Sequence, residues 1–185
     1  MPLEIVGIAG SLRAGSYNRA LLRAAAEVAP AGMRVEIADL RPLPLYDGDT
    51  EAAGLPPAVA ELKARVRAAD ALLVVTPEYN YSVPGVLKNA LDWLSRGADS
   101  ALVGRAAGIM GASPGGFGTV RAQHHLRQVA AGANLLVMTR PEVHVAHAAD
   151  KFDREGRLTD DATRRSVSAF LAALGAWAEL HRRSA

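Results

Sequence analysis

The chain has 185 residues and a formal net charge of +2, with 50% hydrophobic and 22% charged residues. This composition can support a hydrophobic core, excludes global disorder and predicts one domain over residues 1–185. The absence of cysteine excludes disulfides, thiolate metal sites and a cysteine nucleophile, and the scattered basic residues argue against a nucleic-acid-binding face.

The start of the chain shows no export signal. The first residues, MPLEIVGIAGSLR, enter a strand pattern directly, without the basic segment, apolar core and cleavage site of a signal peptide. No apolar run approaches the roughly 18 residues that span a membrane. We therefore expect a cytoplasmic protein with no membrane insertion.

Strand and helix patterns alternate along the chain. Apolar runs predict strands over residues 4–9, 34–39, 71–76, 105–111 and 135–138. Apolar residues at helical spacing predict helices between them, one of them over residues 84–96, and a last helix that ends near His181. Residues 40–57, which hold four prolines and two glycines, and residues 143–156 are expected to be irregular.

These five strand–helix units predict a three-layer α/β domain with a parallel sheet. We expect a five-stranded parallel sheet in the order 2-1-3-4-5. In that order the loops after strands one, three and four lie close together. They stand at the carboxyl ends of the strands, where open parallel sheets bind their ligands.

The first of these loops, residues 10–18, concentrates small residues, hydroxyls and one arginine directly before a helix. Glycines permit tight turns, and a helix start offers free N–H groups and the positive end of its dipole. Such a loop can cradle a phosphate, with side-chain donors Ser11, Arg13, Ser16 and Asn18. The alternative is an ordinary capped loop. Neither GxGxxG nor GxxxxGK[ST] is present here, which argues against a dinucleotide on this turn and against a nucleoside triphosphatase.

The other two loops carry different chemistry. Residues 77–85, PEYNYSVPG, combine aromatic rings with hydrogen-bonding groups, and residues 112–119, ASPGGFGT, hold glycines that let the backbone approach a flat ligand. The alternative for the latter is a flexible turn with Thr119 as a helix cap. Together the three loops fit a mononucleotide with one phosphate and a flat ring system, for which FMN is the natural candidate.

Three motifs carry a resemblance to a known family. They are G-S-L-R-x-x-S-x-N over residues 10–18, P-E-Y-N-Y-S-V-P-G-x-L-K-N-A-x-D-W-x-S-R over residues 77–96, and R-x-Q-x-H-L-R-Q over residues 121–128. They resemble the NAD(P)H-dependent FMN reductases, more narrowly the branch that reduces quinones, chromate and azo dyes. The resemblance covers nearly the whole chain. It implies a flavodoxin-like fold, bound FMN, NADPH or NADH as co-substrate, and a homodimer that is often assembled into a homotetramer.

The resemblance also implies where FMN lies. The phosphate is expected in the loop that holds Ser11, Arg13, Ser16, Tyr17 and Asn18. The isoalloxazine edge is expected along Pro77, Glu78, Tyr79 and Asn80, largely through their backbone, with Ser113, Gly115 and Gly116 on the other side of the ring. The roles of Arg121 and Arg127 stay open between surface charge, a subunit interface and the NADPH phosphate.

Because a flavin carries the redox chemistry itself, no catalytic acid or base is expected among the side chains. No metal site is expected either, since His144 and His147 have no carboxylate cluster at ligand spacing. The expected reaction passes hydride from NAD(P)H to bound FMN and then to a small-molecule acceptor: a quinone, an azo dye, chromate or free flavin.

Three other functions remain open at this point. An electron carrier like flavodoxin would hold FMN without oxidising NADPH. A reductase that supplies reduced flavin to a partner monooxygenase would hold FMN weakly. A scaffold or sensor that keeps only the fold would bind no flavin.

Overall fold

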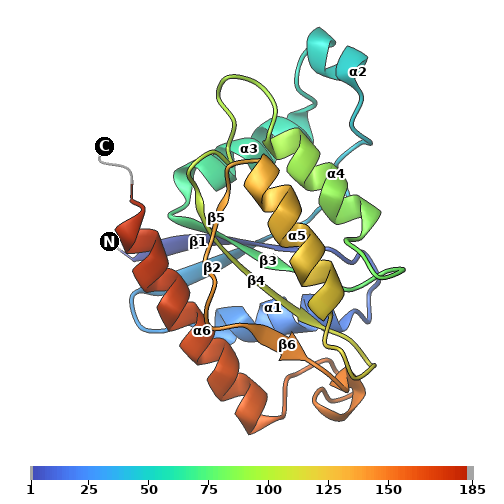
Figure 1. Cartoon of the computed structure of the whole chain (residues 1–185), viewed down its shortest axis with the longest axis vertical. Coiled ribbons are helices and arrows are strands. Elements are labelled where there is room, and N and C mark those ends of the chain that lie inside the picture. The colour runs from blue at the N-terminus through green and yellow to red at the C-terminus, as the bar shows by residue number, and fades with distance from the viewer. Residues whose placement is uncertain (1, 183–185) are drawn as a thin grey trace.

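The computed structural model describes residues 2–182 (Figure 1). In chain order its elements are β1 (Leu3–Ala9), α1 (Tyr17–Glu27), β2 (Met33–Ala38), α2 (Gly48–Ala53), α3 (Pro57–Ala68), β3 (Ala71–Val75), α4 (Gly85–Leu94), β4 (Ala106–Ala112), α5 (Val120–Gly132), β5 (Leu136–Val137), β6 (Val143–Val145), a 3₁₀ turn (Ala148–Asp150) and α6 (Asp161–Leu180). The expected bounds of the first four strands agree with these to within one residue.

The strands form one parallel sheet in the order β2-β1-β3-β4-β5, which confirms the expected order. The central strand β3 is paired on both sides, and Leu73 lies opposite Gly7 of β1 and Gly108 of β4. All five residues of β3 are buried, as its continuous apolar run predicts. The loop that follows β3 therefore emerges from the middle of the sheet.

The expected count of five strands needs a correction. A sixth strand, β6, pairs with Met110–Ala112 of β4, whereas β5 pairs with Ala106–Ala107. Two short strands thus share the edge beside β4, and the expectation of an irregular segment over residues 143–156 is wrong at β6 and at the 3₁₀ turn. A strand of three residues is too short to show a period-2 pattern in the sequence.

Two hydrophobic clusters hold the three layers together. Successive residues of a strand point to opposite faces, so that Leu73 packs with α1 and α6 while Leu72 packs with α3, α4 and α5. Figure 1 shows the same division of the helices between the two faces of the sheet. The layers fix the carboxyl ends of β1, β3 and β4 relative to one another.

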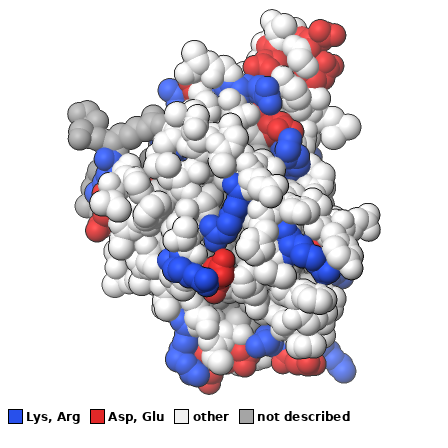
Figure 2. Space-filling model, viewed as in Figure 1, with Lys and Arg blue, Asp and Glu red and all other residues white. Residues whose placement is uncertain are grey.

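The connection over residues 40–57 also differs from expectation, because it contains the helix α2. Its prolines and Gly54 lie outside the helix and Gly48 is its first residue, and the Asp47 carboxylate caps it by accepting from the Asp49 N–H at 2.9 Å. The helix protrudes from the body of the molecule (Figure 1) and acidic side chains gather over it (Figure 2).

The base of this protrusion is tied to α4. Trp93 Nε1 and Asn89 Nδ2 both donate to the Pro44 carbonyl, at 2.9 and 2.8 Å, and the Tyr46 N–H donates to Asn89 Oδ1 at 2.7 Å. The Tyr46 ring also packs edge-on against Trp93, with 4.9 Å between centroids.

Within residues 2–182, no helix is both long and apolar enough to cross a membrane.

Candidate functional site

Three loops meet at the carboxyl edge of the sheet. The Tyr79 hydroxyl, in the loop after β3, donates to Ser11 Oγ, in the loop after β1, at 3.3 Å. The Glu78 carboxylate reaches the start of α5, where it accepts hydrogen bonds from Arg121. The sheet order therefore brings together the loops in which the sequence analysis placed its candidate residues.

The loop after β1 offers a set of hydrogen-bond donors. Within residues 2–182, the backbone N–H groups of residues 11–15 and 17 have no acceptor. The Ser16 hydroxyl accepts from the N–H groups of Asn18 and Arg19, at 3.2 and 3.3 Å, and so caps α1 while its own hydrogen stays available. Arg13 is exposed and makes no ion pair within the described part of the chain. Such a cluster of N–H, O–H and guanidinium donors fits a phosphate.

Two other expected phosphate residues have structural contacts. The Asn18 side chain is 3% exposed, donates to the Ala112 carbonyl and accepts from the Ala112 N–H, both at 2.9 Å. The Tyr17 ring packs against Phe152, with 5.6 Å between centroids. Both residues thus position α1, and their direct contact with a phosphate stays a prediction.

The loop after β3 is a tight turn closed by two backbone hydrogen bonds. The Tyr79 N–H donates to the Ser82 carbonyl at 3.1 Å and the Ser82 N–H donates to the Tyr79 carbonyl at 3.0 Å. Asn80 and Tyr81 between them have positive φ angles of 48° and 69°. The N–H groups of Glu78 and Asn80 have no acceptor among residues 2–182. A fixed turn with free N–H groups can bind the polar edge of a flat ring.

Pro77 is buried at the start of this loop, close to the loop after β1. A Cβ added at Gly10 would lie 3.2 Å from Pro77 Cδ and 3.1 Å from Leu87 Cδ2. Gly10 therefore lets the two loops approach each other more closely than a residue with a side chain would. This close contact sets the distance between the loop expected to bind the phosphate and the loop expected to bind the isoalloxazine edge.

Glu78 caps α5 from the neighbouring loop. Its Oε2 accepts from the N–H groups of Arg121 and Ala122, at 3.1 and 3.2 Å, and its Oε1 accepts from Arg121 Nε at 2.5 Å. A carboxylate here is stabilised by the positive end of the helix dipole. Thr119, the cap considered from sequence, makes no side-chain capping bond; its hydroxyl accepts from Gln123 Nε2 at 3.1 Å.

The loop after β4 presents open backbone. A Cβ added at Gly115 would meet nothing within 4 Å, and one added at Gly116 would lie 3.7 Å from His147 Nε2. The loop is held from behind, because the His147 N–H donates to the Gly115 carbonyl at 3.1 Å and the Ser113 N–H donates to the Val145 carbonyl at 3.0 Å. It can therefore lie against a flat ligand without rearranging.

Sequence reasoning missed a cluster on the rim of the site. The Arg121 guanidinium carbon lies 3.8 Å from the ring centroid of Tyr81 and 4.4 Å from that of Phe117. The sequence analysis left the role of Arg121 open, and it assigned no role to the Tyr81 and Phe117 rings. The one available signal was an aromatic residue in each of two neighbouring loops. The arginine that joins them could not be identified from sequence, since its partner Glu78 is 43 residues away.

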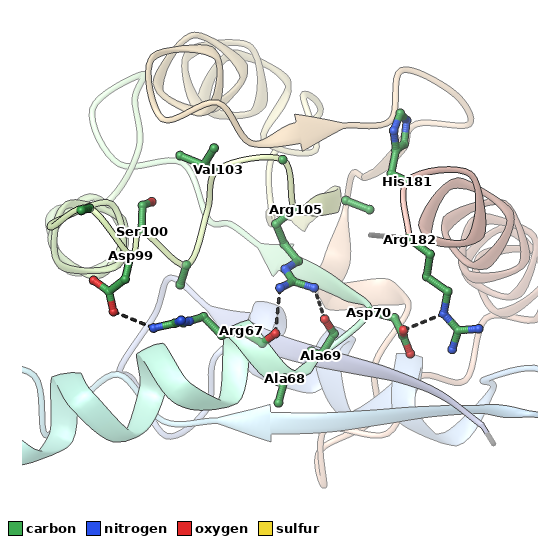
Figure 3. A pocket seen from close by; sticks show the side chains of 14 residues that line it. Arg67, Ala68, Ala69, Asp70, Asp99, Ser100, Val103, Arg105, His181 and Arg182 are labelled. Atoms are coloured by element: carbon green, nitrogen blue, oxygen red, sulfur yellow. Dashed lines mark hydrogen bonds and ion pairs between the residues drawn. The ribbon is translucent and has the colours of Figure 1, made fainter. Parts of the chain in front are cut away.

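A cavity of about 960 Å³ lies at the opposite, amino-terminal end of β3 and β4 (Figure 3). Its charged groups are already paired: Arg67 with Asp99 at 2.6 Å and Arg182 with Asp70 at 3.0 Å. Arg105 donates to the carbonyls of Arg67 and Ala69, at the end of α3. The three loops, with their free donors, are the better candidate site.

Within residues 2–182, no three His, Asp or Glu side chains are grouped to hold a metal.

Comparison with known proteins identifies the family of the chain. The family model for NADPH-dependent FMN reductases matches residues 3–150. The chain is 49% identical over 175 residues to an NAD(P)H-dependent FMN reductase of Pseudomonas aeruginosa, covering 95% of each chain, and 41% identical over 176 residues to a quinone reductase of Escherichia coli, covering 94% of each. The structure superposes with a TM-score of 0.88 on FerB, a flavoenzyme NAD(P)H:acceptor oxidoreductase of Paracoccus denitrificans that is 32% identical, covering 97% of this chain and 98% of that one. The chain belongs to the NADPH-dependent FMN reductase family, a family of flavin-dependent oxidoreductases.

Proposed function

We propose that this protein is an FMN-dependent NAD(P)H:quinone oxidoreductase. The observation that carries the proposal is the meeting of three loops, one with free donors for a phosphate, one with free backbone N–H groups and one with open glycine backbone. The E. coli relative is named a quinone reductase, which supports a quinone as the acceptor. Azo dyes, chromate and free flavin are further acceptors of the same redox class.

The phosphate of FMN would lie against the loop before α1. Ser11, Arg13 and Ser16 supply side-chain donors, and the free N–H groups of residues 11–15 and 17 complete the shell. Arg13 adds the one permanent charge, which strengthens hydrogen bonds to a phosphate. Tyr17 and Asn18 hold the start of α1 in place.

The isoalloxazine ring would lie between the other two loops. Pro77, Glu78, Tyr79 and Asn80 form one wall, with the free N–H groups of Glu78 and Asn80 toward the polar edge of the ring. Ser113, Gly115 and Gly116 form the other wall, where open glycine backbone allows close approach.

Bound FMN supplies hydride acceptance from NAD(P)H and two-electron reduction of the acceptor. Overall, NAD(P)H is oxidised, and a quinone gains that hydride's two electrons and proton plus one proton from water to become the hydroquinone. The Glu78 carboxylate is engaged by Arg121 and two N–H groups, so it is not free to act as a base. Its part is to hold the loop, and no side chain is assigned as a catalytic acid or base.

Steady-state kinetics test this function. NADPH and quinone concentrations are varied together, and parallel double-reciprocal lines are expected, because the two substrates use the same flavin face in turn. A protein that retains FMN but oxidises no NADPH or NADH would be an electron carrier instead.

A reductase that releases reduced FMN is the second candidate. It is favoured by the name of the P. aeruginosa relative and by the open backbone at Gly115. Gel filtration separates the two candidates. Flavin that stays with the protein fits the quinone reductase, and flavin that elutes alone, with turnover that depends on added FMN, fits the supplier.

The proposal also covers the extent of the domain, the oligomeric state and the location of the protein in the cell. We place the whole chain in one FMN-binding domain, since Leu171 and Leu174 of α6 lie in the same core cluster as Leu73 of β3. A homodimer or homotetramer is expected from the family, with the hollow between α4 and α5 as a contact surface. Dependence on NAD(P)H, an intracellular metabolite, supports a cytoplasmic location.

A further inference from the structure

A hollow lies between α1 and β2, beside the loop expected to bind the FMN phosphate. Its volume is about 170 Å³, far above the roughly 10–15 Å³ that one water molecule needs. Arg19 and Leu22 of α1 line it, together with residues 37–40 at the end of β2 and Ser11 of the loop after β1. This space is called the α1–β2 hollow below.

The sheet order places the α1–β2 hollow on the side of the phosphate loop that faces away from the ring. β2 lies beside β1 at the edge of the sheet, whereas the loops expected to hold the isoalloxazine ring follow β3 and β4. Arg41 ties the loop after β2 to the loop after β1, because it pairs with Asp39 at 2.8 Å and donates to the Leu12 carbonyl at 3.2 Å. A group attached to the FMN phosphate and directed away from the ring would therefore reach this hollow.

The hollow has an apolar wall that is open to solvent. Leu22 and Leu40 are buried, whereas Ile37 on the edge strand β2 is 44% exposed. Ile37 is paired with Gly7 of β1, where an added Cβ would lie 2.6 Å from Leu22 Cδ1, so the Ile37 side chain is on the face of the sheet that α1 covers. An exposed apolar side chain in a hollow suits the flat face of a nucleobase.

Two arginines of α1 that line the hollow are placed against local electrostatic preference. Arg19 is in the first turn of the helix, where the dipole disfavours a positive charge, and Arg23 follows one turn later, where like charges repel. Within residues 2–182, neither side chain forms a hydrogen bond or an ion pair. Departures from local preference are expected at functional sites, and unpaired cations suit an anion.

We propose that the α1–β2 hollow receives the adenosine phosphate end of FAD, so that the protein binds FAD as well as FMN. The inference rests on the proposed function, because the flavin and its first phosphate take the places described there. The adenine lies against Ile37, and the second phosphate faces Arg19 and Arg23. Asp39 supplies a carboxylate for a ribose hydroxyl, as a carboxylate does in other dinucleotide-binding α/β folds.

This arrangement differs from that of the Rossmann fingerprint. There, glycines let the pyrophosphate lie on the backbone of the first turn. The loop over residues 10–18 lacks GxGxxG, and arginine side chains meet the second phosphate instead. The missing glycines therefore exclude a pyrophosphate held by backbone alone and are compatible with FAD bound in this way.

The affinity of flavin-free protein for each flavin tests the site without turnover. FMN and FAD are titrated separately by calorimetry. The wild type should bind FAD with a Kd within about ten-fold of that for FMN, since the arginines offset the charge that the FMN phosphate loses on esterification. A larger difference would overturn the proposal.

Arg19→Gln tests the charge at the second phosphate. It should raise the Kd for FAD about ten-fold, because a charge-assisted contact is lost, and change the Kd for FMN by less than about three-fold. Arg165→Gln, at an exposed arginine on α6, is the control and should change neither Kd.

Ile37→Glu tests the apolar wall. It should raise the Kd for FAD by more than about ten-fold, because it replaces the apolar contact by a negative charge close to a phosphate. Val103→Glu is the matched control, since Val103 is an equally exposed apolar residue, at 45%, in the cavity at the opposite end of the sheet. It should leave both Kd values unchanged.

Three further results decide between the accounts. An equal ratio of the two Kd values in wild type, Arg19→Gln and Ile37→Glu would overturn the adenosine site. A Kd for NADP⁺ that rises in Arg19→Gln while that for FAD stays constant would assign the hollow to the nicotinamide nucleotide and overturn it too. A protein that binds both flavins as expected but does not oxidise NAD(P)H would refute the proposed function and leave the adenosine site supported.

Discussion

Asn18 and Ala112 are 94 residues apart in the chain and form a closed pair of hydrogen bonds. The Asn18 amide donates to the Ala112 carbonyl and accepts from the Ala112 N–H, both at 2.9 Å. The pair joins the first turn of α1 to the end of β4. It thus fixes the expected phosphate loop relative to the expected ring-binding loop.

Replacing Asn18 by Ala should destabilise the protein by about 2–4 kcal/mol, because two buried backbone groups lose their partners. Chemical denaturation measures this change. Glu179→Ala, at an exposed carboxylate on α6, is the control and should cost less than about 0.5 kcal/mol. If Asn18→Ala leaves stability unchanged and greatly weakens FMN binding, the amide binds the phosphate instead.

Gly111 should tolerate no side chain. A Cβ there would lie 2.0 Å from Thr119 Oγ1 and 2.3 Å from the Thr76 carbonyl oxygen. Gly111→Ala must therefore displace backbone and should cost about 3 kcal/mol or more. Gly132→Ala, where the added Cβ would meet nothing within 4 Å, should be neutral or stabilising by up to about 1 kcal/mol. Equal melting temperatures for the two variants would show that the packing around Gly111 is looser than described.

Arg13→Ala should weaken FMN binding by about 10- to 100-fold, because it removes a charge-assisted contact with the phosphate. The Kd is measured by titrating flavin-free protein with FMN. Arg165→Ala, an exposed arginine on α6, serves as the control and should not change the Kd. A further check uses riboflavin, which lacks the phosphate. The variant and the wild type should bind riboflavin equally. A loss of riboflavin affinity in Arg13→Ala would indicate that Arg13 does not act through the phosphate.

Asp160 should contribute stability that disappears in acid. It caps α6 by accepting from Thr163, and these hydrogen bonds together with Lys151 lower its pKa to about 2. Because the folded pKa is below the unfolded value of about 4, the contribution is present above pH 4 and is lost as the pH falls toward 2.

The variant Asp160→Asn isolates this effect. Asn can still cap the helix but cannot ionise. The difference in unfolding free energy between wild type and variant should therefore shrink as the pH is lowered from 5 to 2. A difference that stays constant over this range would mean that the Asp160 carboxyl is not the titrating group.

The fold was largely predictable from sequence, because its signals are local. The run at residues 72–75 indicates a strand buried on both faces, and the spacing of Leu87, Leu91 and Leu94 indicates the helix that follows. The short elements were not predictable. β6 has three residues, and α2 is hidden by the prolines around it. Their formation depends on tertiary contacts, such as the pairing of β6 with β4.

The site was predictable as three loops, but not as a set of contacts. Motifs indicate Ser11, Ser16 and the turn around Asn80, because glycines, caps and turn residues act locally. The contacts of Asn18 with Ala112 and of Glu78 with Arg121 span 94 and 43 residues, and only the folded sheet brings them together. Sequence reasoning therefore could not identify either of these contacts, and it left the role of Arg121 undecided.

The central claim is that the three loops hold an FMN that NAD(P)H reduces and a quinone reoxidises. The protein is purified without added flavin, its visible spectrum is recorded, and NADPH is added without oxygen, followed by menadione. The account predicts the two visible flavin bands in stoichiometric amount, bleached by NADPH and restored by menadione. A colourless protein that cannot be reconstituted with FMN would contradict it.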